Sequence, residues 1–207
     1  GLGRAEAIGL AQAGATVVVN DMAGALDKSD VLAEIEAAGS KGVAVAGDIS
    51  ARSTADELVA TADSLGGLAI VVNNAGITRD KMLFNMTDEE WDAVIAVHLR
   101  GTWLGIREAS AVMREQKSGS IVNISSLFGI VAPPGQSAYS SSKFAIRGFT
   151  DSLRAELLHE GSGVKVTMVQ LPGLNTPQFT WVKTTLSQHP RPVAPVFQPE
   201  VAARAIV

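Results

Sequence analysis

The sequence predicts an α/β fold in which a parallel sheet is covered by helices. Short apolar runs bounded by Gly, Asn or Asp alternate along the chain with longer segments of helical periodicity. Such alternation is typical of βαβ units with right-handed crossovers. The composition agrees, because 46% of the 207 residues are hydrophobic but only 5% are aromatic, which suits a sheet under alanine-rich helices. We expect a single domain spanning residues 1–207.

The predicted elements follow from these periodicities. The strands are expected at residues 16–20, 42–47, 68–73, 120–125 and 164–171. The helices are expected at residues 4–13, 29–38, 53–65, 88–115 and 138–160. Thr87 and Ser53 each precede acidic residues, so both are expected to cap the start of a helix. Residues 172–199 are rich in proline and show neither period, which predicts a long loop.

The last predicted helix carries its apolar residues at four-residue intervals. The packing stripe expected from this spacing is Ala145, Phe149, Leu153 and Leu157.

Charge and residue usage exclude several classes of protein. The net charge is −4 with both signs interspersed, so no basic surface for nucleic acid is expected. There is no cysteine, and the three histidines are scattered, which argues against disulfides and metal ligands. No apolar run approaches the ~18 residues that would span a bilayer, and no signal peptide opens the chain. A cytoplasmic protein without nucleic-acid, membrane or metal partners is expected.

Two features predict a dinucleotide site on a Rossmann-type, doubly wound parallel sheet with helices on both faces. Gly1-Leu2-Gly3 leads into a helix whose backbone N–H groups would hold a pyrophosphate. Asp21 ends the next strand, where a carboxylate would bind a ribose 2′-hydroxyl and repel a 2′-phosphate. This pattern favours NAD over NADP. The alternative for Asp21 is a turn residue at a strand end.

Asn73 and Asn74 end a buried strand and are followed by Ala75 and Gly76. Buried amides need partners for both oxygen and nitrogen, and the small residues beside them leave room for a flat ligand ring. A turn stapled by the asparagine side chains explains the segment equally well.

Tyr139 and Lys143 lie four residues apart, which places them on one face of a predicted helix. The lysine charge would then lower the pKa of the phenol toward the range useful in acid–base catalysis. Ser126 comes just after the strand 120–125, at whose carboxyl end an open α/β sheet binds ligands. Three polar groups are therefore expected to meet. Ser125 competes with Ser126, and either serine could simply serve a turn, just as the Tyr–Lys pair could be an exposed pair.

Taken in order, these motifs resemble the short-chain dehydrogenase/reductase family over nearly the whole chain. The resemblance rests on Gly1-Leu2-Gly3 as the end of the family's T-G-x-x-x-G-x-G, Asp48, Asn73-Asn74-Ala75-Gly76, Ser126, Tyr139-x-x-x-Lys143 and Pro172-Gly173. Residues 76–80 and 87–91 look especially like bacterial 3-oxoacyl reductases and hydroxyacyl or hydroxysteroid dehydrogenases.

The resemblance implies an NAD(P)-dependent oxidoreductase that transfers hydride between a nicotinamide and a carbonyl or secondary alcohol. It implies Tyr139 as general acid/base, Ser126 as the partner of the substrate oxygen, and Lys143 as a ligand of the nicotinamide ribose. The residues expected to bind the cofactor are Gly1, Leu2, Gly3, Asp21, Asp48, Ile49, Asn74, Ala75, Gly76, Tyr139, Lys143, Pro172 and Gly173.

Three features depart from the family pattern. His98 stands where most members carry a catalytic Asn, so it is expected in the catalytic set as a variant; a backbone-held water, or a histidine that merely packs in its helix, are the alternatives. Thr176 lies one residue nearer to Pro172-Gly173 than usual. The first strand and the start of the glycine motif are absent, and the chain stops before the family's last strand, so we expect a fragment of a longer protein.

Other functions remain open on this fold. A non-catalytic dinucleotide-binding sensor or structural subunit is the main alternative, and an epimerase or dehydratase of nucleotide-linked substrates is a weaker one. Residues 174–199 form the expected substrate loop, in which Phe179, Trp181 and Val182 would wall an apolar pocket or simply pack the loop. The resemblance also suggests a homodimer or homotetramer assembled through the helices 88–115 and 138–160.

Overall fold

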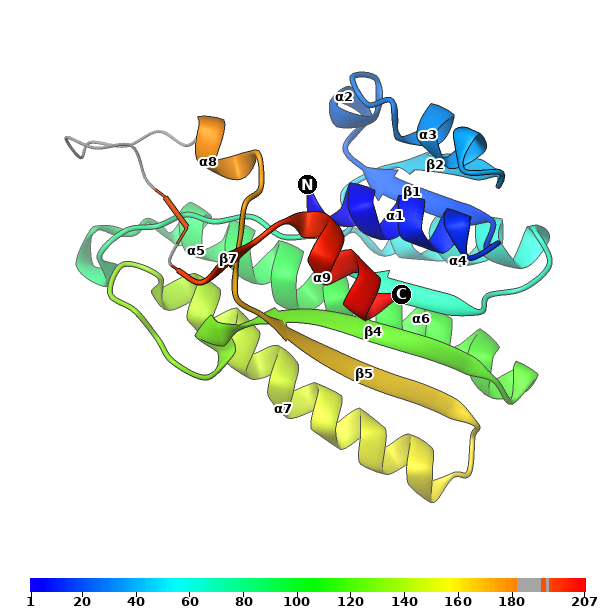
Figure 1. The fold of residues 1–207 in the computed structure, drawn as a ribbon. Helices are drawn as coiled ribbons and strands as arrows, with labels where there is room; N and C mark the ends of the chain where they lie inside the picture. The colour runs from blue at the N-terminus through cyan, green and yellow to red at the C-terminus, as the bar shows by residue number, and fades with distance from the viewer. Residues whose placement is uncertain (182–190, 193) are drawn as a thin grey trace. The chain divides into compact units, whose positions relative to one another are not determined.

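The computed structural model describes residues 1–181, 191–192 and 194–207, which form two compact units. The first unit contains Gly1–Val19, Ser29–Val43 and Leu171–Val207, and the second contains Asn20–Lys28 and Ala44–Gln170. Strands and helices alternate along the chain (Figure 1), and the pairs β3–β4 and β6–β7 are parallel. The α/β prediction is therefore confirmed.

The first unit packs two helices around one small apolar cluster. Its elements are α1 (Leu2–Gln12), α3 (Val31–Ala37), β6 (Gly173–Leu174), α8 (Gln178–Trp181), β7 (Val196–Phe197), α9 (Pro199–Ile206), and the first parts of the paired strands β1 (Val17–Asp21) and β2 (Gly42–Ala46). The cluster consists of Ala7, Ala11, Val17, Val31 and Ile35. An ion pair between Arg4 and Glu34 joins α1 to α3 at the surface.

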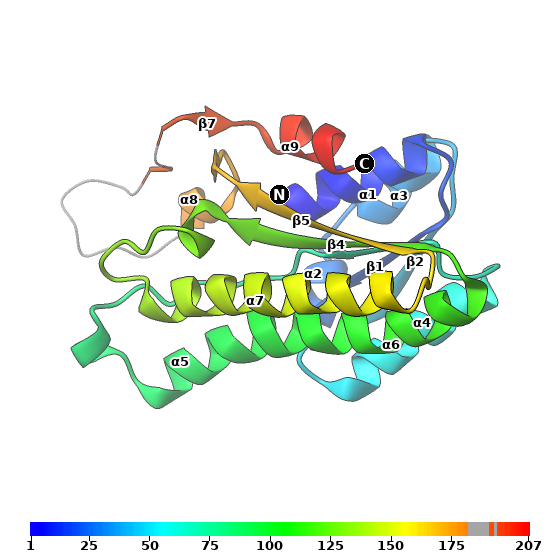
Figure 2. The same cartoon turned by 90° about the horizontal axis from the view of Figure 1, so that it is seen from below.

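The second unit is a three-stranded sheet in the order β3–β4–β5 with helices against it. Its elements are α2 (Ala23–Leu26), α4 (Arg52–Ser64), β3 (Ile70–Asn73), α5 (Asp88–Ile95), a π-helical turn (Ala96–Arg100), α6 (Gly101–Gln116), β4 (Gly119–Ser126), α7 (Ser137–His159) and β5 (Val164–Leu171). In Figure 2, α6 and α7 lie on the same side of β4 and β5. The apolar core between these layers contains Leu68, Ile106, Ala109, Met113 and Ile121.

The strand β4 is the centre of this unit. Its residues Ile121–Ser125 are all buried, as expected for the middle strand of a parallel sheet. No helix in the described ranges is both long and apolar enough to cross a membrane.

All five predicted strands and five predicted helices are present, with small shifts at their ends. Thr87 caps α5 as predicted: its hydroxyl accepts from Glu90 N at 3.3 Å, and the Glu90 carboxylate accepts from Thr87 N at 3.1 Å. The prediction for Ser53 is wrong. The helix α4 begins one residue earlier with Ala51 as its N-cap, so Ser53 already lies inside the first turn.

Two predictions about longer segments need correction. The predicted helix 88–115 is interrupted by the π-helical turn Ala96–Arg100, a feature that periodicity does not reveal. The predicted structureless loop 172–199 is wrong, because it contains β6, α8 and β7. Its last residue, Pro199, opens α9 at a position where a missing N–H costs nothing.

The packing stripe of α7 is also slightly displaced. Phe149 and Leu153 pack on the core cluster and Leu157 is buried, as predicted. The most deeply buried side chains, however, are Ser142, Ile146 and Thr150, one residue further along the helix. Two of these residues are polar, so a search for apolar periodicity does not detect this face of α7.

A chain of polar side chains ties β3, β4 and α7 together. Asn73 Nδ2 donates to Asn123 Oδ1 at 2.9 Å, and Asn123 Nδ2 donates to Thr150 Oγ1 at 2.9 Å. The Thr150 hydroxyl donates in turn to Ile146 O at 2.6 Å. Asn123 is fully buried, and its bond to Thr150 is made away from water. Asn73 thus bonds across the sheet to β4, and does not staple the turn after β3 as the structural alternative expected.

We expect Asn123→Ala to lower the free energy of unfolding by about 2–4 kcal/mol, because it leaves buried groups of Asn73 and Thr150 without their partner. Urea unfolding of the purified protein followed by circular dichroism measures the loss. The same substitution at the exposed Asn85 should cost less than about 0.5 kcal/mol. Equal losses in the two variants would contradict a role for the network.

Candidate active site

Ser126, Tyr139 and Lys143 converge in the second unit. Ser126 is the last residue of β4, rather than just beyond it, and Tyr139 lies in the first turn of α7. The Ser126 hydroxyl hydrogen-bonds with the Tyr139 side chain and also accepts from Phe128 N at 3.2 Å. Lys143 follows one turn along α7, and its Nζ lies 5.5 Å from the centroid of the Tyr139 ring. The three groups expected to meet therefore do meet.

Ser125 does not share this position. It is buried, and its hydroxyl has no hydrogen-bond partner in the described part of the chain. A Cβ on Gly129 would come within 2.9 Å of that hydroxyl, so Ser125 faces the short turn after β4. Of the two candidate serines, the structure brings Ser126 to the phenol.

The electrostatics of the Tyr139–Lys143 pair differ from the sequence-based expectation. Burial raises the pKa of Tyr139, the Asp80 carboxylate raises it further, and the hydrogen bond with Ser126 opposes the rise. Lys143 is itself buried, its Nζ donates to Ile124 O at 2.8 Å, and burial lowers its pKa to about 8. The expected lowering of the phenol pKa is thus wrong here, because desolvation dominates and the amine is directed at a carbonyl.

His98 packs beside the phenol from the π-helical turn. The two rings meet edge to face, with centroids 5.1 Å apart and an interplanar angle of 88°. His98 Nε2 lies 2.6 Å from Ile77 O and 3.0 Å from Ile77 N, so the tautomer protonated at Nε2 donates to the carbonyl. Gly76 has no side chain where the His98 ring lies, and a Cβ there would clash with the ring.

The imidazole of His98 is neutral at physiological pH. Burial and the nearby Lys143 charge lower its pKa to about 4, against the effect of the Ile77 contact. Its Nδ1 is buried without a hydrogen-bond partner among the residues described. His98 therefore anchors the loop after β3 and keeps one free nitrogen inside the site.

Two polar residues near the phenol escaped the sequence-based search. Gln136 Nε2 donates to Asp80 Oδ2 at 3.0 Å, and Lys81 N donates to Gly135 O at 2.8 Å. The loop after β3 is thereby attached to the segment that leads into α7. No periodicity or spacing marks these residues, since both lie in irregular backbone.

The predicted cofactor residues are divided between the two units. Gly1, Leu2, Gly3, Pro172 and Gly173 belong to the first unit. There α1 begins at Leu2 with no side-chain cap, which leaves its first amides suited to a phosphate. A Cβ on Gly1 would lie 3.8 Å from the ring of Pro177, so the segment after β5 passes close to the glycine turn.

The remaining cofactor candidates belong to the second unit. Asp21 is the exposed last residue of β1, and its Oδ1 accepts from Met22 N at 2.8 Å, as the turn alternative requires. Asp48 is also exposed, and its Oδ1 accepts from the backbone N and the hydroxyl of Ser50, each at 2.8 Å. Exposed carboxylates of this kind suit the hydroxyl and amino groups of an adenosine.

The turn that carries Asp48 and Ile49 is fixed to the π-helical turn. Arg100 Nε donates to Ser50 O at 3.0 Å, and a Cβ on Gly101 would lie 3.0 Å from Ile49 Cγ2. Asn74, Ala75 and Gly76 follow β3 directly, and the latter two are exposed. The binding of a cofactor by these residues stays a prediction.

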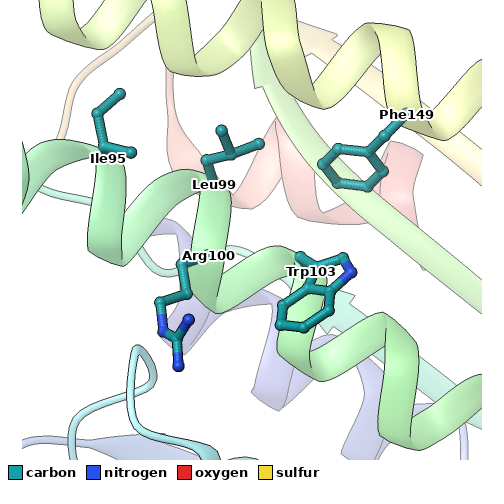
Figure 3. Close-up of a pocket in the computed structure, with 5 residues that line it drawn as sticks. All are labelled: Ile95, Leu99, Arg100, Trp103 and Phe149. Carbon is teal, nitrogen blue, oxygen red and sulfur yellow. The ribbon is translucent and has the colours of Figure 1, made fainter.

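A separate apolar hollow of about 310 Å³ lies on the helical side of the second unit. It is lined by Ile95, Leu99, Arg100, Trp103 and Phe149, and Figure 3 shows Phe149 facing the other residues from a different helix. It shares no residue with the Ser126–Tyr139–Lys143 cluster. The predicted assembly through these helices stays a prediction.

The predicted substrate loop is only partly described. Phe179 is half-buried in α8, Trp181 ends that helix, and Val182 lies outside the described residues. An apolar wall formed by these three residues stays a prediction.

Comparison with known proteins gives a consistent result. The family profile described as short chain dehydrogenase matches residues 1–186. The hydroxyacyl-CoA dehydrogenase ChsB1 of Mycobacterium tuberculosis is 62% identical over 162 residues, which are 72% of this chain and 51% of that protein. A 3-oxoacyl-[acyl-carrier-protein] reductase of Synechocystis is 40% identical over 162 residues, covering 78% of this chain and 66% of the relative.

The likeness extends to a solved structure. A crystal structure from Sinorhizobium meliloti 1021, assigned to the short-chain alcohol dehydrogenases, superposes with a TM-score of 0.79 at 31% identity over 85% of this chain and 69% of the other. The Rossmann-like arrangement expected from the sequence is therefore confirmed. The chain spans about half the length of the mycobacterial relative and 66% of the cyanobacterial one.

We expect acid to destabilise the protein through His98. Its pKa is 6.5 when exposed and about 4 in the folded chain, so between these values the unfolded chain binds a proton that the folded chain does not. Stability then falls as pH falls through this range, by about 3 kcal/mol in all. His98→Asn should lose this dependence in urea unfolding experiments.

The control is His159→Asn, which removes an exposed histidine at the end of α7 and should keep the dependence. Burial raises the pKa of Glu6 to about 7, which gives an opposite slope, but that contribution is common to all three proteins. A pH profile identical in His98→Asn and the unmodified protein would refute the neutral, buried state of His98.

Proposed function

Because the chain belongs to the short-chain dehydrogenase family, we propose that it carries the catalytic site of an oxidoreductase acting on a hydroxyl or oxo group with NAD(P). The observation that supports this is the meeting of Ser126, Tyr139 and Lys143, with His98 against the phenol, at the end of β4. Bound nicotinamide would supply the carbon that gives or takes the hydride. The chain supplies orientation and the proton.

Tyr139 exchanges the proton with the substrate oxygen. In reduction its hydroxyl gives a proton to the carbonyl oxygen, and in oxidation the phenolate takes the proton of the alcohol. Ser126, already hydrogen-bonded to the phenol, donates to the same substrate oxygen and stabilises its negative charge. His98 restricts the phenol to one orientation through the edge-to-face contact.

Lys143 acts from one turn further along α7. Its buried amine would hold the ribose hydroxyls of the cofactor, and burial lowers its pKa to about 8. The uncapped start of α1 would bind the pyrophosphate, and Asp21 would bind the ribose of the adenosine half, which favours NAD.

The substrate is proposed to be a hydroxyacyl or oxoacyl thioester. The two relatives named above act on hydroxyacyl-CoA and on 3-oxoacyl-[acyl-carrier-protein], and both align with more than two thirds of this chain. A panel of hydroxyacyl-CoA esters, hydroxysteroids and simple secondary alcohols, each with NAD and with NADP, tests the proposal by the appearance of reduced cofactor. Oxidation of simple alcohols but of no thioester would contradict it.

Tyr139→Phe should reduce kcat by at least about a hundredfold, the usual contribution of a positioned general acid/base. Cofactor affinity, measured by quenching of protein fluorescence, should stay nearly unchanged because the ring and its contact with His98 remain. A variant that retains near-native kcat would show that another group transfers the proton.

Asp21→Ser should raise KM for NAD by about tenfold, since it removes a charged hydrogen-bond acceptor, and should improve the use of NADP. Initial rates with each cofactor give the ratio of kcat/KM. Asp63→Ser, at an exposed position of α4, serves as control and should leave the ratio unchanged. If Asp21→Ser leaves the ratio of kcat/KM for the two cofactors unaltered, Asp21 serves only the turn at the end of β1.

A further inference from the structure

A short 3₁₀ turn, η3 (Leu127–Gly129), follows β4 and packs on the helix that carries Tyr139. Ser126 caps this turn, because its hydroxyl accepts from Phe128 N at 3.2 Å. The Phe128 ring meets the Tyr139 ring edge to face, with centroids 6.4 Å apart and an interplanar angle of 86°. The turn is thus joined to Ser126 at its start and to Tyr139 through one ring contact.

Gly129 is the residue whose backbone lies closest to α7. It is buried, whereas the nearby Leu127 and Ile130 are 49% and 45% exposed, so neither of these apolar side chains attaches the turn. A Cβ on Gly129 would lie 3.2 Å from Lys143 O and 3.3 Å from Lys143 Cβ, both tighter than ordinary van der Waals contact. The backbone of η3 therefore approaches α7 more closely than a residue with a side chain would allow.

Ser125 closes the other side of this narrow space. Its hydroxyl would lie 2.9 Å from a Cβ on Gly129, and Ser125 is itself buried. The Ser125 hydroxyl ends a rotatable side chain, whereas the two close atoms of Lys143 belong to its backbone and to its first side-chain carbon. Gly129 therefore fits between the end of β4 and the second turn of α7 because it has no side chain.

A side chain added at position 129 would displace η3 rather than α7. The helix α7 has 23 residues, and Lys143 is also held by the bond from its Nζ to Ile124 O at 2.8 Å. The turn η3 has only three residues, of which the first is half exposed. The shorter element would yield, so Phe128 would move away from Tyr139 and the capping bond at Ser126 would be disturbed.

We propose that Gly129 is a positioning residue for the reaction: because it has no side chain, η3 lies close enough to α7 to hold Phe128 against the Tyr139 ring and Ser126 in its place at the end of β4. This inference rests on the proposed roles of Ser126 and Tyr139. Gly129 itself touches no substrate and exchanges no proton. It acts through the short distance that it allows between the turn and the helix.

The first test uses the fact that Tyr139 is the only tyrosine among the 207 residues. Protein made with ring-labelled tyrosine gives the NMR signals of this ring alone, and their chemical shifts depend on the neighbouring aromatic rings. In Gly129→Ala these shifts should move part of the way toward those of Phe128→Leu, which lacks one neighbouring ring. In Gly148→Ala they should stay unchanged, because a Cβ at this exposed position of α7 meets nothing within 4 Å.

The second test separates the chemical step from cofactor binding. Gly129→Ala should lower kcat by about tenfold, since small misplacements of reacting groups cost large factors in rate. Cofactor affinity, measured by quenching of protein fluorescence, should change little because Lys143 keeps its bond to Ile124. Gly148→Ala should alter neither quantity. A merely structural role of Gly129 would lower the urea midpoint of Gly129→Ala while leaving kcat of the folded enzyme unchanged.

A double variant identifies which contact sets the place of the turn. Ser125→Ala removes the hydroxyl nearest to the added methyl group, but both contacts with Lys143 remain. Ser125→Ala combined with Gly129→Ala should therefore recover only part of the lost kcat. Full recovery would overturn the proposal, since Ser125 rather than α7 would then limit the approach of η3. The double variant replaces Gly129→Ala in both tests if the single variant does not fold.

The remaining outcomes are distinct. Unchanged ring signals in Gly129→Ala, or an equal change in Gly148→Ala, overturn the proposal. Moved ring signals with an unchanged kcat overturn it as well, because the turn would then move without consequence for the reaction. If the unmodified protein turns over no substrate, the proposed function fails, while the ring signals still decide whether Gly129 positions η3.

Discussion

The hydrogen bond from the Lys143 amine to the Ile124 carbonyl is the contact on which the site depends. It joins the second turn of α7 to the end of β4, and so brings the helix residue Tyr139 to the strand residue Ser126. Burying an ammonium group costs free energy unless it is well hydrogen-bonded, and the pKa of about 8 reflects that cost. This cost is confined to Lys143, where an amine that can lose its proton is chemically useful.

The contact of His98 with the Tyr139 ring depends on the π-helical turn. His98 lies within this wider turn, and its imidazole contacts Ile77 and the phenol. The same turn ends beside Gly101, whose lack of a side chain admits Ile49, and its Arg100 binds the backbone at Ser50. One irregular turn thus positions the loops after β2 and β3.

Most of the fold and the centre of the site could be predicted from sequence because they follow from regular periods. Apolar runs separated by helical segments located the strands β1 to β5, and the four-residue step with a serine after a buried strand located Tyr139, Lys143 and Ser126. The features that could not be predicted from the sequence depend on tertiary contacts. The π-helical turn has no sequence signature, β6 and β7 are two residues each, and the tether between Asp80 and Gln136 joins two loops. The rise in the pKa of Tyr139 could not be predicted for the same reason, since burial is a property of the fold.

The first turn of α7 and the groups packed against it hold several polar atoms without partners. Within the described residues, His98 Nδ1, Ser140 Oγ and Gln136 Oε1 are buried without hydrogen-bond partners. Each such atom costs about 1–3 kcal/mol, so a fold optimised for stability alone would not place several of them in one short segment of the chain and its contacts. His98 contacts the Tyr139 ring, Ser140 is its neighbour in sequence, and Gln136 lies one turn before it. Their position around the first turn of α7, while the core of the same unit is apolar and the buried Asn123 is paired through both its oxygen and its nitrogen, supports the proposal that this turn belongs to a reaction site.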